Sequence, residues 1–210
     1  MTTSAPKPAR AAHRPSAREA MLDAAEAHLG ADGTLTLDSA ARAAGVSKPG
    51  LMYHFPTKEE LLRAILERIT TRCEQEMVAA VAVAAGGVPA DAVADAEAVS
   101  AVAVLVDATA VQRHLAYLAW AGEAQLSPAD LVIFADPRLR VSLTERWQEQ
   151  VERWLHVPAG TPAHERSRLL AVRLMADGLW FDRASGLLAT TAPEAASLRA
   201  LAAELLGGEA

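Results

Sequence analysis

The sequence predicts an all-α fold, with a small N-terminal head of three helices followed by a larger helical domain. Three observations predict this class. Apolar residues recur at the three- and four-residue spacing of helices, and no series of alternating, strand-like segments is present. Helix-start signals are frequent, and Gly and Pro separate the segments that they open. With 210 residues, 51% of them hydrophobic, the chain is long enough to bury a sizeable core.

The first helix is expected to begin at the capping box Ser16-Ala17-Arg18-Glu19, where the Ser hydroxyl and the Glu carboxylate each accept a backbone N–H of the other residue. Gly30 and Gly33 are expected to end it. Its apolar stripe consists of Met21, Ala24, Ala25 and Leu29. This helix completes the head, whose other helices are predicted in residues 34–66.

Residues 34–66 have the layout of a helix, a glycine turn, a short exposed helix and a third, capped helix. Ala40 and Ala41 are small enough to let a second helix cross closely over the first. Gly45 then supplies a turn position that tolerates positive φ. This layout is typical of a protein that contacts DNA.

The second helix of this segment is expected to be short and exposed. It starts at Ser47 or Lys48, because Ser47 is placed as an N-cap and Pro49 falls in the first turn. It ends near Phe55. Its outer face carries Lys48, Gly50, Met52, Tyr53 and His54. This mixture suits contact with a DNA groove, and the alternative for each residue is a solvated helix face.

The segment resembles the N-terminal domain of the tetracycline-repressor (TetR) family, whose helix-turn-helix has the form T-x-x-x-x-A-x-x-A-G-V-S-x-x-x-L-Y-x-H/Y-F-x-x-K-x-x-L. The matching residues are Thr36, Ala41, Ala44, Gly45, Val46, Ser47, Leu51, His54, Phe55, Lys58 and Leu61. The resemblance covers about a sixth of the chain and implies a DNA-binding regulator. Met52 departs from the pattern, since the family usually carries Tyr there, and Tyr53 is placed to supply the phenol instead.

The candidate DNA-binding residues are Arg14, Thr36, Ser47, Lys48, Pro49, Gly50, Met52, Tyr53, His54 and Lys58. Cations and polar groups supply phosphate contacts, whereas base edges in the major groove supply sequence choice. We expect Gly50 to let the backbone approach a base and Met52 to meet a thymine methyl. The capping box of Thr57 and Glu60 opens the next helix beside Lys58, and a phosphate is expected there.

The chain carries a formal charge of −6, but its charges are unevenly distributed. Residues 1–58 hold seven Lys and Arg against five Asp and Glu, a balance of +2, and the remainder has a balance of −8. The head is therefore the basic end. Residues 1–15 are predicted to form a flexible basic arm. The arm either follows the minor groove or the phosphates, or stays solvated.

Gly and Pro divide the rest of the chain into further helices. They are predicted from Thr57 to about Ala84, from Asp91 to about Gln125 as one helix or two with Asp107 as a candidate cap, from Asp136 to Leu155, from Thr161 to about Gly186, and from Thr191 to Gly207. A short segment lies between Ser127-Pro128 and Asp136-Pro137.

The last two helices carry more apolar surface than one small domain needs. These residues are Leu169, Leu170, Leu174, Met175, Leu179 and Trp180, then Leu198, Leu201, Leu205 and Leu206. They favour half of an intermolecular four-helix bundle, and the alternative is an intramolecular core. The resemblance implies a homodimer through these helices, because TetR-type proteins dimerise there. Two heads would then bind half-sites of a palindromic operator together.

The candidate ligand-binding residues are Tyr117, Trp120, Glu123, Phe134, Trp147, Asp177, Trp180 and Phe181. Aromatic walls with a few polar groups are typical of small-ligand pockets, and the same aromatics also build ordinary cores. Glu123, Asp177 and Asp182 lie close in sequence to Trp residues, which suggests a small hydrophobic or cationic effector. The predicted domains are thus residues 1–15 (arm), 16–60 (head) and 61–210 (ligand binding and dimerisation).

No arrangement of nucleophile, His and acid, no phosphate-binding glycine loop and no His pair of metal-site spacing is present, so neither enzyme, metal site nor cofactor is predicted. Cys73 lies on an apolar stripe, which favours core packing over a redox switch. No membrane span or signal peptide is expected, and the predicted location is cytoplasmic. The predicted function is a dimeric repressor released by an effector. The alternative is a regulator of the same fold controlled by a protein partner or by no effector.

Overall fold

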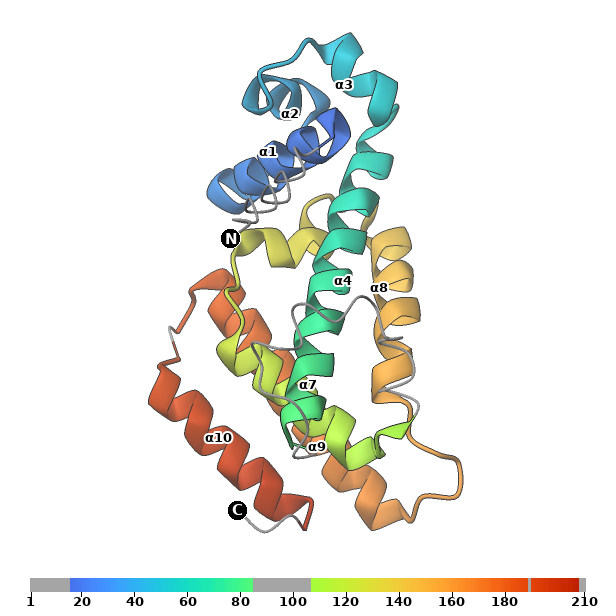
Figure 1. Cartoon of the computed structure of the whole chain (residues 1–210), viewed down its shortest axis with the longest axis vertical. Helices are drawn as coiled ribbons and strands as arrows, with labels where there is room; N and C mark the ends of the chain where they lie inside the picture. The colour runs from blue at the N-terminus through green and yellow to red at the C-terminus, as the bar shows by residue number, and fades with distance from the viewer. Residues whose placement is uncertain (1–15, 85–106, 189, 208–210) are drawn as a thin grey trace, which may run out of the picture.

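The computed structural model describes residues 16–84, 107–188 and 190–207, and every regular element in these ranges is a helix (Figure 1). The elements are α1 (Ala17–Asp32), α2 (Leu37–Ala43), α3 (Lys48–His54), α4 (Lys58–Ala84), α7 (Ala110–Glu123), the 3-10 helix η1 (Pro128–Phe134), α8 (Arg140–Leu155), α9 (Ala163–Ser185) and α10 (Ala192–Leu205). The predicted all-α class is confirmed. The predicted arm, residues 1–15, lies outside the described residues, and no described helix is long and apolar enough to cross a bilayer.

Helices α1, α2 and α3 form a head at one end of the molecule (Figure 1). The predicted capping box of Ser16 and Glu19 starts α1. A second box, made by Thr36 and Ser39, starts α2. Gly45 turns the chain between α2 and α3 with a φ of 66°, a conformation that suits a residue without a Cβ. Gly33 ends α1 with a φ of 66°, as the sequence predicts, whereas Gly30 lies inside the helix and does not end it.

Helix α4 connects the head to the remainder of the molecule, which we call the body and which comprises η1 and α7–α10 (Figure 1). It contacts α1, to which Arg68 and Arg72 form ion pairs, and it packs against η1, α7 and α8. Cys73 and Met77 are buried on this helix, with their sulfur atoms 3.6 Å apart. The prediction that Cys73 packs in the core is confirmed.

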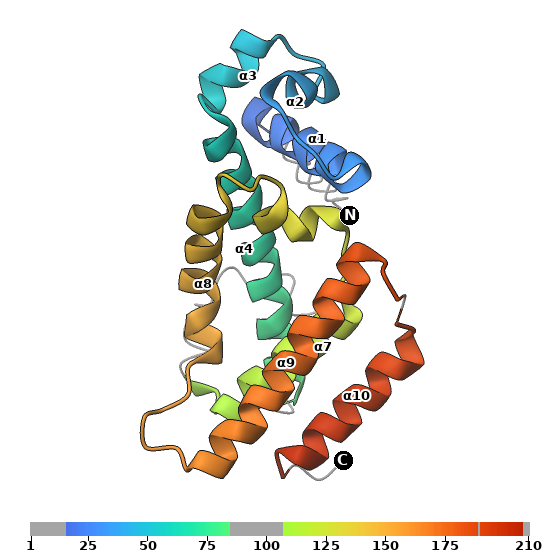
Figure 2. The ribbon, with the colours of Figure 1, turned by 180° about the vertical axis from the view of Figure 1, so that it is seen from behind.

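Helix α7 is the central element of the body and packs against both α4 and α9, while α10 lies beside α7 and α9 (Figure 2). Gly122 on α7 allows this close packing. A Cβ on that residue would lie 3.4 Å from both the Ala195 Cβ and the Leu179 Cδ2. A side chain larger than that of alanine would press on α9 and α10 together.

Two predicted helix starts are wrong. Thr109, rather than Asp107, caps α7, because its side chain accepts the Gln112 N–H in a capping box. Helix α8 begins at Arg140, and not at Asp136. The Asp136 carboxylate instead accepts the Arg138 N–H and binds Lys58, so it holds a turn and an ion pair. The predicted helix start at Asp91 lies outside the described residues.

A set of ion pairs joins the head to the body. The Arg72 guanidinium on α4 lies 3.0 Å from Glu26 Oε1 on α1 and 3.2 Å from Asp130 Oδ1 on η1. Asp130 is almost fully buried and accepts the Ser127 N–H at 2.7 Å. Burial alone would lower the pKa of Arg72, but the carboxylates of Glu26 and Asp130 outweigh it and raise that pKa. One cation thus fixes three elements to one another.

His114 on α7 gives the fold a sensitivity to acid. It is buried, its Nδ1 lies 2.7 Å from the Ala110 carbonyl oxygen, and burial lowers its pKa from the ordinary value of 6.5. A lowered folded-state pKa means that stability is complete above 6.5 and is lost as the pH falls towards the folded value.

We predict that the free energy of unfolding falls between about pH 7 and about pH 5, and falls less in His114→Gln, which keeps a side-chain donor near Ala110. Chemical denaturation at a series of pH values measures this. His164→Gln is the control, because His164 is exposed. An identical pH dependence in the native protein and His114→Gln would contradict the prediction.

Candidate functional site

Helix α3 presents an exposed face at the end of the molecule farthest from the body (Figure 1). Leu51 is fully buried and anchors the helix to the head. Its neighbours Met52 and Tyr53 are 38% and 84% exposed. Because Leu51 faces inwards, the next two residues face solvent, as a helix of 3.6 residues per turn requires.

The N-terminus of α3 is fixed by its cap. The Ser47 hydroxyl accepts the Gly50 N–H at 3.2 Å, and Pro49 lies in the first turn. A Cβ on Gly50 would lie 3.2 Å from the Ser47 Oγ, so a larger residue would press on the cap. Gly50 therefore has a structural role in addition to the base approach that the sequence predicts.

Two other predicted DNA-binding residues also make local contacts. The Thr36 hydroxyl accepts the Ser39 N–H at 3.0 Å and caps α2. The His54 ring, at the end of α3, meets the Tyr53 ring edge-on, with centroids 5.0 Å apart. The first contact fixes the start of α2, and the second lies within α3 itself.

The predicted phosphate-binding lysines each contact a carboxylate. Lys48 Nζ lies 2.9 Å from Asp38 Oδ2 on α2, in an exposed pair. Lys58 Nζ, on the first residue of α4, lies 2.7 Å from Asp136 Oδ2 in the body. The Lys58 hydrogen bond, followed by the Arg138 N–H, lowers the pKa of Asp136. Arg14, the remaining predicted cation, lies outside the described residues.

One cation near α3 was missed by the sequence reasoning. Arg42 lies in the last turn of α2 and is exposed. It makes no ion pair within the described residues. The helix pattern itself could have identified it, because Arg42 falls outside the apolar face formed by Ala40, Ala41 and Ala44.

The body contains a hollow of about 630 Å³ between α7, α8 and α9, which we call the body hollow. It is lined by Tyr117, Thr144, Trp147, Gln148, Val151, Glu152, Leu155, Arg173, Asp177 and Trp180. Four of the eight predicted ligand-binding residues, Tyr117, Trp147, Asp177 and Trp180, thus come together from three helices.

The other four predicted ligand-binding residues do not line the body hollow. Trp120 is buried and stacks on Tyr117 with centroids 5.5 Å apart. Glu123 is exposed and pairs with Arg199 of α10. Phe134 and Phe181 are exposed on η1 and α9. Their sequence pattern did not distinguish a side chain that faces the hollow from one that faces the core or solvent.

The wall of the body hollow combines stacked indoles with a polar chain. The Trp147 and Trp180 rings lie 5.5 Å apart and 22° from parallel. The Tyr117 hydroxyl donates to Asp177 Oδ1 at 3.0 Å, and Arg173 donates to Asp177 Oδ2 at 2.8 Å. Burial and the neighbouring Asp177 raise the pKa of Tyr117, so the phenol stays protonated. The buried Trp180 Nε1 has no hydrogen-bond partner within the described residues.

The acids that suggested a cationic effector are all engaged. Glu123 pairs with Arg199, and Asp177 pairs with Arg173. Asp182 accepts the Leu188 and Thr190 N–H groups of the α9–α10 turn. Since a cation would have to compete with each of these contacts, the geometry favours the hydrophobic effector over the cationic one.

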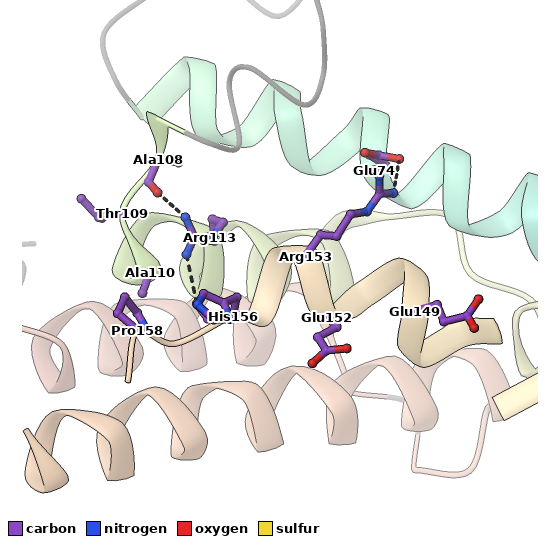
Figure 3. Close-up of a pocket in the computed structure, with 10 residues that line it drawn as sticks. All are labelled: Glu74, Ala108, Thr109, Ala110, Arg113, Glu149, Glu152, Arg153, His156 and Pro158. Carbon is purple, nitrogen blue, oxygen red and sulfur yellow. Dashed lines mark hydrogen bonds and ion pairs between the residues drawn. The ribbon is translucent and has the colours of Figure 1, made fainter. Parts of the chain in front are cut away.

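A second hollow, of about 700 Å³, lies where α7 begins and α8 ends (Figure 3). Arg113 donates to the carbonyl oxygens of Ala108 and His156 there. Figure 3 shows that Glu149 and Glu152 point away from Arg113. The polar groups of this second hollow therefore do not converge on one point, and it is a weaker candidate for a ligand-binding site than the body hollow. Among the described residues, no cluster of His, Cys, Asp or Glu is arranged to hold a metal ion.

Comparison with known proteins links the N-terminal part of the chain to a family. No curated protein matches the chain. The model of the family described as "Bacterial regulatory proteins, tetR family" matches residues 21–65, which run from α1 through α2 and α3 into the first turns of α4. These are the helices that hold and present the exposed face of α3. The N-terminal part of this chain is therefore the DNA-binding domain of the tetR family, and the protein is a DNA-binding regulator of transcription.

Proposed function

We propose that the protein is a homodimeric repressor, which binds a palindromic operator in the cytoplasm and leaves it when a small hydrophobic effector enters the body hollow. The observation that carries the DNA part is the arrangement of α3, where Leu51 is buried and Tyr53 is 84% exposed. A helix of seven residues that is capped, anchored and exposed at the end of the molecule suits insertion into a major groove.

The proposed DNA contacts divide into two kinds. Lys48, Tyr53 and Arg42 supply donors for phosphate oxygens. Met52 and Gly50 face the bases, through apolar contact with a thymine methyl and close backbone approach. The remaining proposed contacts are Arg14, Thr36, Ser47, Pro49, His54 and Lys58. Phosphate contacts give affinity, so losing one weakens binding to all sequences alike.

The proposed dimer uses the outer faces of α9 and α10, which lie side by side in Figure 2. Leu170, Leu174 and Phe181 are exposed on one face of α9, and Leu201 is exposed on α10. Gly178 lies on the same face, and a Cβ there would meet nothing within 4 Å. A glycine inside a helix costs about 1 kcal/mol relative to alanine, and no close packing among the described residues offsets this cost at Gly178. Close approach of α9 from a second copy would offset this cost.

The proposed effector is a flat, largely hydrophobic compound. The stacked Trp147 and Trp180 rings provide an aromatic surface, and the Tyr117–Asp177–Arg173 chain provides polar contacts. Helix α8 contributes Trp147 to the body hollow and begins directly after the turn that holds Asp136. An occupant that moves α8 would therefore shift the contact between body and α4, and with it the separation of two heads.

DNA binding is tested first by selection of genomic fragments with the purified protein, followed by titration of the enriched duplex. We predict that Tyr53→Ala lowers affinity about 10-fold, since it removes a donor to phosphate without affecting the core. Phe134→Ala is the matched control, because it truncates an exposed aromatic residue on the body. Equal loss in both variants, or no enriched sequence, contradicts the proposal.

The dimer is tested by sedimentation of Gly178→Leu. A Cβ at position 178 meets none of the described residues within 4 Å and leucine favours the helix, so the helical signal is expected to persist while the dimer dissociates at least about 10-fold more readily. Gly160→Leu, also at a position where a Cβ meets nothing within 4 Å, is expected to leave the dimer intact. If the Gly178→Leu protein still forms the native dimer, α9 is not part of the interface.

The effector is tested by titrating flat aromatic compounds, with lipophilic cations in parallel, and following Trp fluorescence. Binding is expected to quench the fluorescence and to release DNA, and Trp147→Ala is expected to abolish both effects. Phe134→Ala is the control, since this residue is exposed on η1, outside the hollow and the proposed dimer interface. Fluorescence that no compound changes would favour the alternative of a partner protein or no effector. A response that Trp147→Ala leaves unchanged would show that the compound binds outside the body hollow.

A further inference from the structure

The ion pair between Lys58 and Asp136 connects the proposed DNA-contacting surface to the body. Lys58 is the first residue of α4, directly after the head, and Asp136 lies 78 residues further on, between η1 and α8. The ammonium and the carboxylate are 2.7 Å apart, and their side chains are 31% and 17% exposed. The exposed Lys48–Asp38 pair, by comparison, is 47% and 61% exposed.

The Asp136 carboxylate is held in position independently of Lys58. Its second oxygen, Oδ1, accepts the Arg138 N–H at 2.9 Å. The carboxylate therefore remains directed at Lys58 without the loss of side-chain freedom that weakens most surface pairs. Partial burial also reduces the screening of the pair by salt.

We propose that Asp136 limits the affinity of the protein for DNA by neutralising Lys58, so that the body supplies an internal substitute for a phosphate group. This inference rests on the proposed role of Lys58 at the operator. A phosphate and the Asp136 carboxylate both bind an ammonium through charged oxygen atoms. Lys58 has three N–H donors and can contact both, but the pair carries no net charge to displace counterions from DNA.

The inference gives the acidic body a specific role. The chain from residue 59 onward has a balance of −8, and Asp136 is the point where a body carboxylate reaches the first residue of α4. The same turn leads into α8, whose side chains line the body hollow. The strength of the Lys58 pair, and not only the spacing of two heads, therefore sets how tightly DNA is held.

The test is Asp136→Asn, which removes the charge and keeps an Oδ1 acceptor for the Arg138 N–H. The expected result is DNA binding about 3- to 10-fold tighter than that of the native protein at low salt. The dependence of log affinity on log salt is expected to steepen by about one. Two probes serve, a duplex of mixed sequence and the duplex enriched by genomic selection, since a phosphate contact affects both.

Two controls separate this effect from a change in net charge. Asp32→Asn removes the same charge from α1, where Asp32 pairs with His28, and is expected to leave affinity unchanged. Lys58→Met is expected to abolish the gain in the Asp136→Asn background and to reduce affinity less in the native background, where Asp136 already neutralises Lys58. If Asp136→Asn reduces the melting temperature, Asp136→Ser provides a hydroxyl acceptor for Arg138 and replaces it.

Equal affinities of Asp136→Asn and Asp32→Asn would overturn the inference. A loss from Lys58→Met that is the same in both backgrounds would overturn it as well. In either case the native protein still binds DNA and the proposed function stands. A native protein that binds neither duplex would overturn both the inference and the proposed function.

Discussion

The arrangement of this protein depends on one constraint, which is that α4 packs against the head and the body at once. It contacts α1 of the head and η1, α7 and α8 of the body. A helix is stiff over this length, so the orientation of the head follows from packing in the body. Arg72 strengthens this coupling, because its contacts with Glu26 and Asp130 join α1, α4 and η1 at a single side chain.

The coupling gives each part of the molecule a physical role in DNA binding. The head supplies an exposed α3 anchored by Leu51. In the proposed dimer, the body would set the position of that helix relative to a second head, and its Asp136 pairs with Lys58 at the start of α4. Burying Asp130 is costly unless its hydrogen bonds are complete, and the Ser127 N–H and Arg72 complete them. These hydrogen bonds therefore give the contact between head and body a defined geometry.

The parts of the fold that local chemistry determines could be predicted from the sequence. The capping boxes at Ser16, Thr57 and Thr191 form as expected, because cap and partner are three residues apart. Asp136 shows where such reasoning ends. Its position before Pro137 resembles a helix start, but its carboxylate binds Lys58, 78 residues away. A local sequence pattern cannot reveal a contact between residues so far apart in the chain, because this contact forms only when α4 packs on the body.

The body hollow shows the same limit for side chains. Aromatic residues could be identified in the sequence, but the sequence does not distinguish Trp147, which faces the hollow, from Phe134, which is exposed. Which of them faces the hollow depends on how α7, α8 and α9 cross. The acids nearby had also suggested a cation, and their partners, such as Arg173 for Asp177, became visible only in the structure.

Protection of an enriched operator from hydroxyl radicals measures whether α4 holds the two heads of the proposed dimer at a fixed separation. Two protected backbone segments are expected, related by the symmetry of the palindrome and separated by about one helical turn of DNA. A single protected segment, or two whose separation varies freely from one operator to another, would contradict this expectation.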